Sequence, residues 1–155
     1  MNDLEWQALP FAMLSASTLL DILCLRQKVF VIEQQCLYEE ADAYEALSTH
    51  LLAIDTSLPT PGIVAYARLL PPNTKYPEPS FGRFLVASSH RGTGLGRELL
   101  QRCIALCQSM YPNTDILISA QLTVQRFYAS QGFVATGPSY DGAGIEHIDM
   151  TLPSR

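Results

Sequence analysis

Two spacings of apolar residues alternate along the chain, and their order predicts its secondary structure. From Thr93 to Met110 the spacing is helical with a wide apolar face, at positions 95, 99, 100, 103, 104, 106, 107 and 110. His50–Asp55 and Gly62–Leu70 are β-rich runs separated by a turn, and they are expected to form an antiparallel hairpin. Asp115–Ala120 is continuous and β-branched, which is typical of a central strand.

The remaining elements are shorter. Strands are predicted at Leu4–Ala8, Phe81–Ser88, Phe133–Gly137 and Glu146–Leu152, and helices at Ser17–Phe30 and Thr123–Gln131. The first of these helices is expected to start from a cap at Ser17 or Thr18. Its apolar side is predicted to carry Leu20, Leu23, Cys24 and Phe30. Tyr111-Pro112 is expected to end the long helix, and Gly132 to cap the last one.

Two segments lack periodicity. Val29–Glu45 is expected to hold a loop or a second short helix, and Pro71–Ser80, with four prolines in ten residues, is predicted to be a surface loop. The middle of the chain alternates strands with helices, while both ends are antiparallel in pattern. The sequence therefore predicts an α/β fold in which a mixed sheet carries helices on its faces.

Composition adds limits to this prediction. The 155 residues fit a single domain, 1–155, and 48% apolar with 16% charged residues is a globular composition. A net charge of −5 argues against binding to nucleic acid or to an anionic membrane, since both need a surplus of Lys and Arg. Phe11–Leu25 is too short and too polar to span a bilayer. We expect no nucleic-acid or membrane partner.

Charges are distributed unevenly. Five acids lie between Glu33 and Glu45 without a basic residue among them, and four arginines lie between Arg83 and Arg102 against the single acid Glu98. The two regions either suit ligands of opposite charge or form two solvated faces.

The four cysteines are at positions 24, 36, 103 and 107. They show no CxxC spacing and no His neighbour at ligand spacing, so no metal site is predicted. Nothing at the N-terminus resembles a secretory signal, and a reduced, cytoplasmic setting is expected. Cys103 and Cys107 lie four apart on an apolar helix side, where small buried residues are the expected role.

Three glycines, Gly92, Gly94 and Gly96, directly follow a predicted strand and precede the long helix. A strand, glycine turn and helix form an anion site, because the first helical turn leaves N–H groups unpaired and the helix dipole favours negative charge there. The Lys-Ser/Thr ending of the Walker motif is missing, and the Rossmann pattern would need glycine where Arg97 stands.

Arg91–Gly96 instead resembles the pyrophosphate loop of the GCN5-related N-acetyltransferase (GNAT) superfamily, Arg/Gln-x-x-Gly-x-Gly/Ala. Phe127–Phe133 resembles a later motif of that family, Leu/Phe-Tyr-x-x-x-Gly-Phe, in the right order. The ElaA-like subgroup is indicated by Leu25–Tyr38, Gly82–Val86 and His147–Met150. The resemblance thus runs from about residue 25 to residue 150.

This resemblance implies a single-domain GNAT fold and transfer of an acetyl group from acetyl-CoA to an amine, without a metal. The two central parallel strands, Phe81–Ser88 and Asp115–Ala120, are expected to splay apart and admit the pantetheine arm. Backbone groups of the first strand are expected to pair with pantetheine and polarise the thioester carbonyl, at Leu85, Val86 and Ala87. Amides of the loop are expected to hold the pyrophosphate, with Arg91 and Arg97 meeting its charge, at Gly92, Thr93, Gly94, Leu95 and Gly96. The alternative is a tight turn with solvated arginines.

Four further residues are candidates for roles in the reaction: the resemblance indicates Gln121 and Tyr128, whereas Glu33 and His147 are suggested by their own chemistry, since the family does not fix the base. Gln121 stands where the family more often has Asn, so it either contacts the CoA arm or faces solvent. Tyr128 is the candidate general acid that protonates the departing CoA thiolate, against a role in the core. Glu33 and His147 are the candidate bases. The alternatives are that Glu33 pairs with Arg83 and that His147 is structural.

The first functional hypothesis is an acetyl-CoA-dependent N-acetyltransferase that transfers directly to a primary amine of a small molecule, with the acidic run bordering the acceptor site. No cysteine has a neighbour that would activate it, so an acetyl-cysteine intermediate is not expected. The alternatives are a CoA-binding or sensing module without turnover, and a protein N-acetyltransferase. Exposed edge strands near the C-terminus are compatible with a homodimer.

Overall fold

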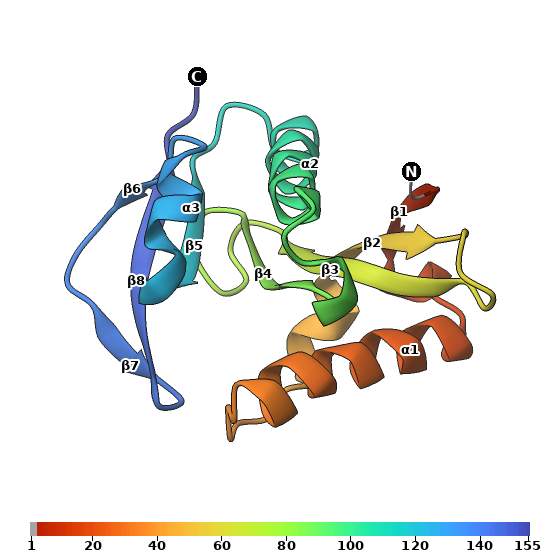
Figure 1. The fold of residues 1–155 in the computed structure, drawn as a ribbon. Coiled ribbons are helices and arrows are strands. Elements are labelled where there is room, and N and C mark those ends of the chain that lie inside the picture. Colours follow the sequence, from red (N-terminus) through yellow and green to blue (C-terminus); the bar gives the residue numbers. More distant parts are fainter. Residues whose placement is uncertain (1–2) are drawn as a thin grey trace.

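Two antiparallel sheets organise the chain in the computed structural model, which describes residues 3–155 (Figure 1). The first sheet has the order β1-β2-β3-β4, and the second has β5-β8-β6 with β7 also paired to β8. The strands are β1 (Leu4–Pro10), β2 (Thr49–Asp55), β3 (Gly62–Leu70), β4 (Ser80–Val86), β5 (Ile116–Gln121), β6 (Val134–Ala135), β7 (Tyr140–Gly142) and β8 (Ile145–Leu152). The α-helices are α1 (Ala16–Arg26), α2 (Leu95–Met110) and α3 (Gln125–Ala129). Short 3-10 turns lie at Phe11–Met13, Ala43–Leu47, Ser88–His90 and Leu122–Val124, and a π-helix at Gln27–Glu33.

The two sheets meet where β4 and β5 begin. The Leu117 N–H donates to the Pro79 carbonyl over 3.1 Å, immediately before β4 and near the start of β5. Beyond this contact the two strands belong to different hydrogen-bonded sheets. They therefore diverge toward their C-terminal ends (Figure 1), as expected for the two splayed strands.

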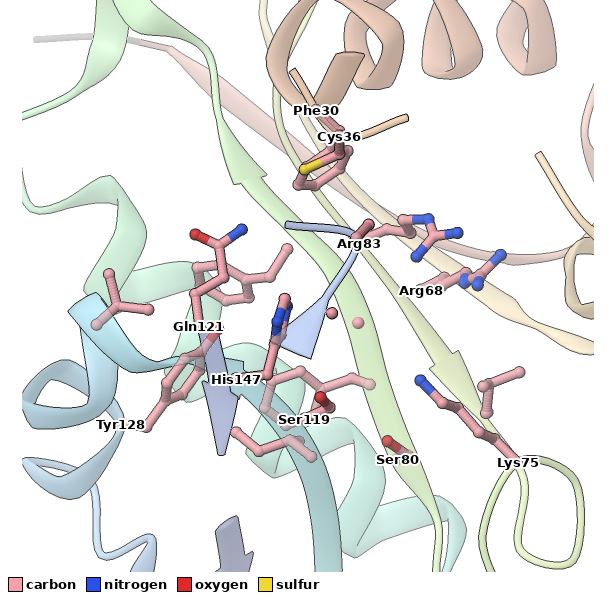
Figure 2. Close-up of a pocket in the computed structure, with 18 of the residues that line it drawn as sticks. Phe30, Cys36, Arg68, Lys75, Ser80, Arg83, Ser119, Gln121, Tyr128 and His147 are labelled. Atoms are coloured by element: carbon pink, nitrogen blue, oxygen red, sulfur yellow. The ribbon is translucent and has the colours of Figure 1, made fainter. Parts of the chain in front are cut away.

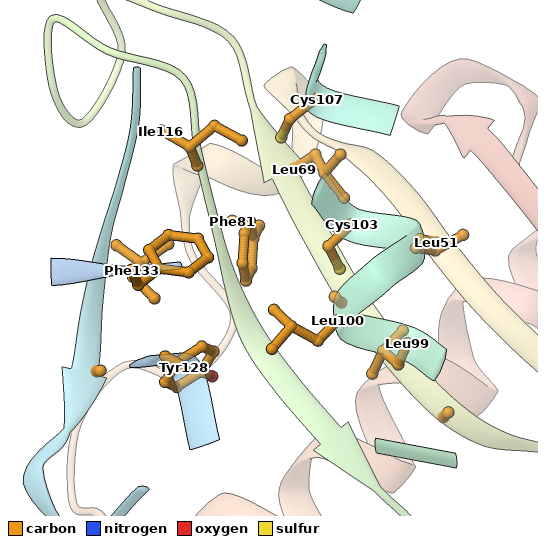
Figure 3. Packing of buried hydrophobic residues seen from close by; sticks show 14 of the residues in the cluster. Leu51, Leu69, Phe81, Leu99, Leu100, Cys103, Cys107, Ile116, Tyr128 and Phe133 are labelled. Carbon is orange, nitrogen blue, oxygen red and sulfur yellow. The ribbon is translucent and has the colours of Figure 1, made fainter. Parts of the chain in front are cut away.

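Helices α2 and α1 cover opposite faces of the first sheet (Figure 1). Figure 3 shows α2 directing Leu99, Leu100 and Cys103, all fully buried, into a core between the sheets. On the other face Ile22 of α1 packs in a separate cluster with Leu52 of β2. Each fully buried leucine stabilises the fold by about 1.5–3 kcal/mol. The predicted covering of the sheet by helices is therefore confirmed.

Helix α1 differs from its prediction at the N-terminus. Ser15 caps it, because its Oγ accepts a hydrogen bond of 3.1 Å from the Thr18 N–H, so the expectation of a cap at Ser17 or Thr18 is wrong. Leu20 is 61% exposed, although it was predicted to lie on the apolar side of this helix. The buried side instead includes Arg26, a charged residue that apolar spacing does not count.

The C-terminal elements are shorter than predicted. Helix α3 has five residues and follows a 3-10 turn, and β6 has two residues. Gly132 has φ of +99° after α3, as a helix-ending glycine requires. Phe133 is buried and meets Phe81 edge-on at 6.0 Å, which attaches this end of the chain to the core.

Candidate active site

The loop before α2 presents a row of free backbone N–H groups. Gly92 and Gly94 have φ of +75° and +86°, a left-handed conformation that residues with a Cβ rarely adopt. The Glu98 N–H makes the first bond of the helix, 3.1 Å to the Gly94 carbonyl. In the part of the chain described, the N–H groups of residues 92–97 have no protein acceptor. Unpaired amides at a helix N-terminus fit a pyrophosphate.

A buried histidine anchors this loop. His90 is 7% exposed, and its Nε2 lies 2.8 Å from Asp55 Oδ2 at the end of β2. Its Nδ1 is 2.8 Å from Ser89 Oγ, and its carbonyl accepts a bond of 2.6 Å from the Thr93 hydroxyl. Hydrogen bonds from Ser57 and His90 lower the pKa of Asp55. The sequence showed only that His90 precedes the loop, because its partner lies 35 residues away.

The side chain of Arg91, in the same loop, is bound by two other groups of the protein. Its Nη2 pairs with Glu33 at 2.9 Å, and its Nε donates to the Val86 carbonyl over 3.0 Å. The alternative that Glu33 pairs with Arg83 is wrong, because Glu33 is exposed at the end of the π-helix and faces Arg91. Arg97 is exposed and lines a surface hollow together with Gly94.

A β-bulge in β4 sets which backbone groups face the gap between the sheets. Arg83 has φ of +49°, and the pairing of β4 with β3 shifts register beside it. The Ala87 N–H donates to the Val64 carbonyl over 2.8 Å, so Ala87 faces β3. Since the hydrogen-bonding direction alternates along an antiparallel strand, Leu85 faces β3 too and Val86 faces the gap. Of the three residues predicted to contact pantetheine, Leu85, Val86 and Ala87, only Val86 directs its backbone N–H and carbonyl toward the gap.

A cavity of about 580 Å³ lies between the two sheets (Figure 2). Figure 2 shows Gln121, Tyr128 and His147 along one wall, with Arg68, Arg83 and Lys75 along the other. All three segments that carry the subgroup resemblance contribute to the lining, through Phe30, Gln34, Cys36, Tyr38, Gly82, Arg83, Phe84 and His147.

His147 lines this cavity from β8. It stands opposite Gln121 in the pairing of β8 with β5. Its Nδ1 lies 2.7 Å from the Ile145 carbonyl, and because a carbonyl only accepts, Nδ1 carries the hydrogen. Nε2 then carries the lone pair of the neutral ring, and it has no hydrogen-bond partner within residues 3–155. The ring stacks on Tyr140 with centroids 6.1 Å apart, which fixes its orientation.

Tyr128 lines the same cavity from α3. Its ring is held edge-on by Phe84 and Phe127, at 6.0 and 5.2 Å. Burial raises the pKa of its hydroxyl, so the group keeps its proton at neutral pH. The hydroxyl has no hydrogen-bond partner in the described part of the chain. The ring is thus part of the aromatic core while the hydroxyl remains available.

Gln121 bridges the cavity rather than pointing to solvent. It is half-buried, and its Nε2 donates to Gln34 Oε1 over 2.8 Å. This bond connects the C-terminal end of β5 to the residue that follows the π-helix. The predicted solvent-facing alternative therefore does not hold.

The acidic run does not present its charge to the cavity. Glu40, Asp42 and Glu45 form ion pairs with arginines, and no Asp or Glu lines the cavity among the residues described. Burial opposes the charge of Asp42, but its hydrogen bonds with Arg68 prevail and lower the pKa of the carboxyl. Three of the five acids of the run are therefore paired with arginines inside the protein, and among the residues described the run adds no carboxylate to the lining of this cavity.

Several lining residues were not indicated by the sequence. Lys75 and Tyr76 belong to the proline-rich loop, and no spacing indicates that this loop folds back over the cavity. Cys36 also lines the cavity, and burial raises the pKa of its thiol. Cys103 and Cys107 are buried as predicted, and burial raises the pKa of the Cys107 thiol to about 12.

Residues 3–155 contain neither a cluster of metal-ligand side chains nor a membrane-spanning helix. No group of three or more His, Cys, Asp or Glu side chains suited to a metal ion occurs there. No helix in that range is long and apolar enough to cross a membrane.

Comparison with known proteins gives the family. The model of the acetyltransferase (GNAT) domain matches residues 23–154. The chain belongs to the GNAT family. Protein ElaA of Escherichia coli is 34% identical over 149 residues, or 95% of either chain. A UPF0039 protein of Synechocystis is 45% identical over 148 residues, covering 96% of this chain and 94% of that protein.

Solved structures agree with this family. An acyl-CoA N-acyltransferase from Pseudomonas aeruginosa superimposes with a TM-score of 0.89 and 34% identity, over 96% of this chain and 99% of the other. The crystal structure of Escherichia coli ElaA gives 0.87 and 32%, with the same coverage. This GNAT protein is therefore an ElaA-like acyltransferase with the acyl-CoA N-acyltransferase fold, and its donor is an acyl-CoA.

Proposed function

We propose that this GNAT protein is a cytoplasmic N-acetyltransferase that moves an acetyl group from acetyl-CoA directly to a primary amine of a small molecule. The observation that carries the proposal is that His147 and Tyr128 line one cavity, and that neither Nε2 of His147 nor the hydroxyl of Tyr128 has a hydrogen-bond partner among the described residues. One group can take a proton and the other can give one, as transfer from a thioester to an amine requires.

The donor site is proposed on the loop and on β4. The free amides of residues 92–97 would hold the pyrophosphate, with Arg97 exposed beside them. Arg91 is paired with Glu33, so it would contact the phosphates either while it keeps this ion pair or after the phosphates replace Glu33 as its partner. The N–H of Val86 faces the gap between the sheets and would polarise the thioester carbonyl.

The reaction residues are proposed on the opposite wall. His147 would accept a proton from the incoming ammonium at Nε2, and Tyr128 would protonate the departing thiolate. Glu33 is the weaker candidate base, since it is exposed, paired with Arg91 and outside the cavity lining. Gln121 would position the CoA arm together with Gln34.

The test is thiol release from acetyl-CoA in the presence of a panel of small amines, peptides and proteins, with products identified by mass spectrometry. An acetylated small amine and an equivalent amount of free CoA are expected. Tight CoA binding without turnover of any acceptor would indicate the sensing module. Selective turnover of peptide or protein amines would indicate a protein N-acetyltransferase, and a preference for longer acyl-CoAs would refute the acetyl donor.

A further inference from the structure

The cavity wall opposite His147 is cationic. Lys75, Arg68 and Arg83 line it, and Figure 2 shows the Lys75 nitrogen pointing inward on the same side as the two guanidinium groups. The chain as a whole carries a net charge of −5, so this concentration of positive charge is local. A surface that gathers cations around an enclosed space favours an anionic ligand.

The two arginines that line this wall are ion-paired with carboxylates, and Lys75 adds a further positive charge. Three carboxylates, on Glu40, Asp42 and Glu45, pair with three arginines, on Arg26, Arg68 and Arg83. Lys75 forms no ion pair among residues 3–155, and its recorded partner is the ring of Tyr76, whose centroid is 5.3 Å from Nζ.

Arg83 retains free donors on the same wall. Its Nε and Nη2 donate to the Glu40 carbonyl, and Nη2 also reaches Asp42 at 3.3 Å. Its Nη1 has no partner in the described part of the chain. Tyr38 stacks on the guanidinium at 4.8 Å, and the left-handed backbone of the bulge directs the side chain toward this wall.

The loop that carries Lys75 is held in shape. The Asn73 N–H donates to the Pro77 carbonyl over 3.2 Å, and the Thr74 hydroxyl donates to the Pro71 carbonyl over 2.7 Å. Its four prolines restrict the backbone further. The position of Lys75 is thus set before a ligand arrives, which lowers the entropic cost of binding.

We propose that the acceptor amine also bears a carboxylate, which binds to Lys75 Nζ and Arg83 Nη1 while its amino group points to Nε2 of His147. This inference rests on the proposed function and names the substrate class of the same site: amino acids and related amino carboxylates. Hydrogen bonds between ammonium or guanidinium groups and a carboxylate are charge-assisted, so one from each of these two side chains would both bind and orient the anion.

The electrostatics agree with this assignment. Loss of water around Lys75, together with repulsion from Arg83 and Arg68, lowers the pKa of its ammonium, although Asp149 and Asp42 partly offset the repulsion. Burial and Arg68 likewise lower the pKa of Arg83. A bound carboxylate would relieve this repulsion, whereas a second cation on the acceptor would increase it.

The experiment compares matched acceptors that differ only in the carboxylate, such as lysine with cadaverine and phenylalanine with phenethylamine. In each pair the carboxylate-bearing member is expected to have at least about tenfold higher kcat/KM, equivalent to about 1.4 kcal/mol. Lys75→Met is expected to remove most of this advantage while leaving the KM for acetyl-CoA unchanged. Lys28→Met is the control, since Lys28 is the other lysine of the chain and is exposed on the π-helix. Short peptides with a free C-terminal carboxylate, assayed in parallel, distinguish a peptide acceptor from a free amino acid.

Three outcomes would overturn the inference while leaving the proposed function intact: equal or faster transfer to the decarboxylated amines, an unchanged preference in Lys75→Met, or acetylation of Lys75 itself. If no amine is turned over, the proposed function fails, and calorimetry with the amino carboxylates on the CoA-loaded protein still tests the site. Binding by the parent and by Lys28→Met but not by Lys75→Met would support the carboxylate site, and equal binding by all three would reject it.

Discussion

Asp55, the last residue of β2, holds His90 at 2.8 Å and so fixes the start of the phosphate loop to the first sheet. Both side chains are buried, and the histidine carbonyl in turn accepts the hydroxyl of Thr93 within the loop. The loop amides are therefore aligned before CoA binds. Such alignment reduces the conformational entropy lost on binding.

Asp55→Ala should therefore weaken CoA binding more than it slows chemistry. Loss of this hydrogen bond is expected to lower the affinity for CoA about fivefold, which calorimetry would measure. The kcat at saturating acetyl-CoA is expected to stay nearly unchanged. Asp21→Ala, at an exposed position of α1, is the matched control. Unchanged CoA affinity in a folded Asp55→Ala variant would show that the anchor has no role in binding.

Gly94→Val should abolish tight CoA binding, because a side chain would project into the space over the loop amides. Gly137→Val is a close control: both glycines have φ of +86° and nothing within 4 Å of an added Cβ, but Gly137 lies outside the loop. The left-handed backbone costs about 1–2 kcal/mol of stability in either variant. Thermal unfolding should show similar losses, and calorimetry should show lost CoA affinity in Gly94→Val alone. Equal CoA affinity in both would remove the loop from the binding site.

Cys36→Ala should retain substantial turnover. This is the cysteine that lines the cavity, but burial raises the pKa of its thiol and so disfavours the thiolate needed for attack. Mass spectrometry during turnover should detect no acetyl group on it. An acetyl-cysteine that forms and decays at the catalytic rate would contradict direct transfer.

Tyr128→Phe should lower kcat by about 10²–10⁴-fold, the usual contribution of general acid catalysis, or roughly 3–5 kcal/mol. The ring and its contacts with Phe84 and Phe127 remain, so melting temperature and CoA affinity should be close to those of the parent. Tyr111→Phe, after the end of α2, controls for loss of a hydroxyl elsewhere. A Tyr128→Phe enzyme within a few-fold of the parent would exclude the hydroxyl from the mechanism.

Acid should destabilise the protein partly through Asp42. Its folded pKa is lowered below the ordinary 3.8, because hydrogen bonds with Arg68 outweigh burial. The stabilisation is therefore present above pH 3.8 and is lost as the pH falls through the lower folded pKa. Asp42→Asn should show a shallower fall in unfolding free energy over this range, measured by urea denaturation. Identical slopes in parent and variant would contradict this contribution.

Local pattern was sufficient for the longer strands, for α2 and for the glycine turn before it, but β6 is shorter than predicted and β7 was not predicted. The helical spacing before Met110 and the glycines at 92 and 94 act through bonds within a few residues, so the chain order alone determines their form. The three segments that resemble the ElaA-like subgroup contain several residues that line the cavity, including His147. Their sequence did not show that these residues come together.

Tertiary structure decided the rest, because those features depend on pairs far apart in the chain. The acidic run appeared free in the sequence, yet three of its five carboxylates, on Glu40, Asp42 and Glu45, form ion pairs with arginines from three other elements, Arg26, Arg68 and Arg83. The bulge at Arg83 shifted the register of β4 by one residue and thereby selected Val86 to face the gap. The local pattern of the chain was enough to indicate the glycine turn before α2 and the GNAT fold, whereas the charge of the cavity wall exists only after folding has paired distant charges and left Lys75 without an ion pair among residues 3–155.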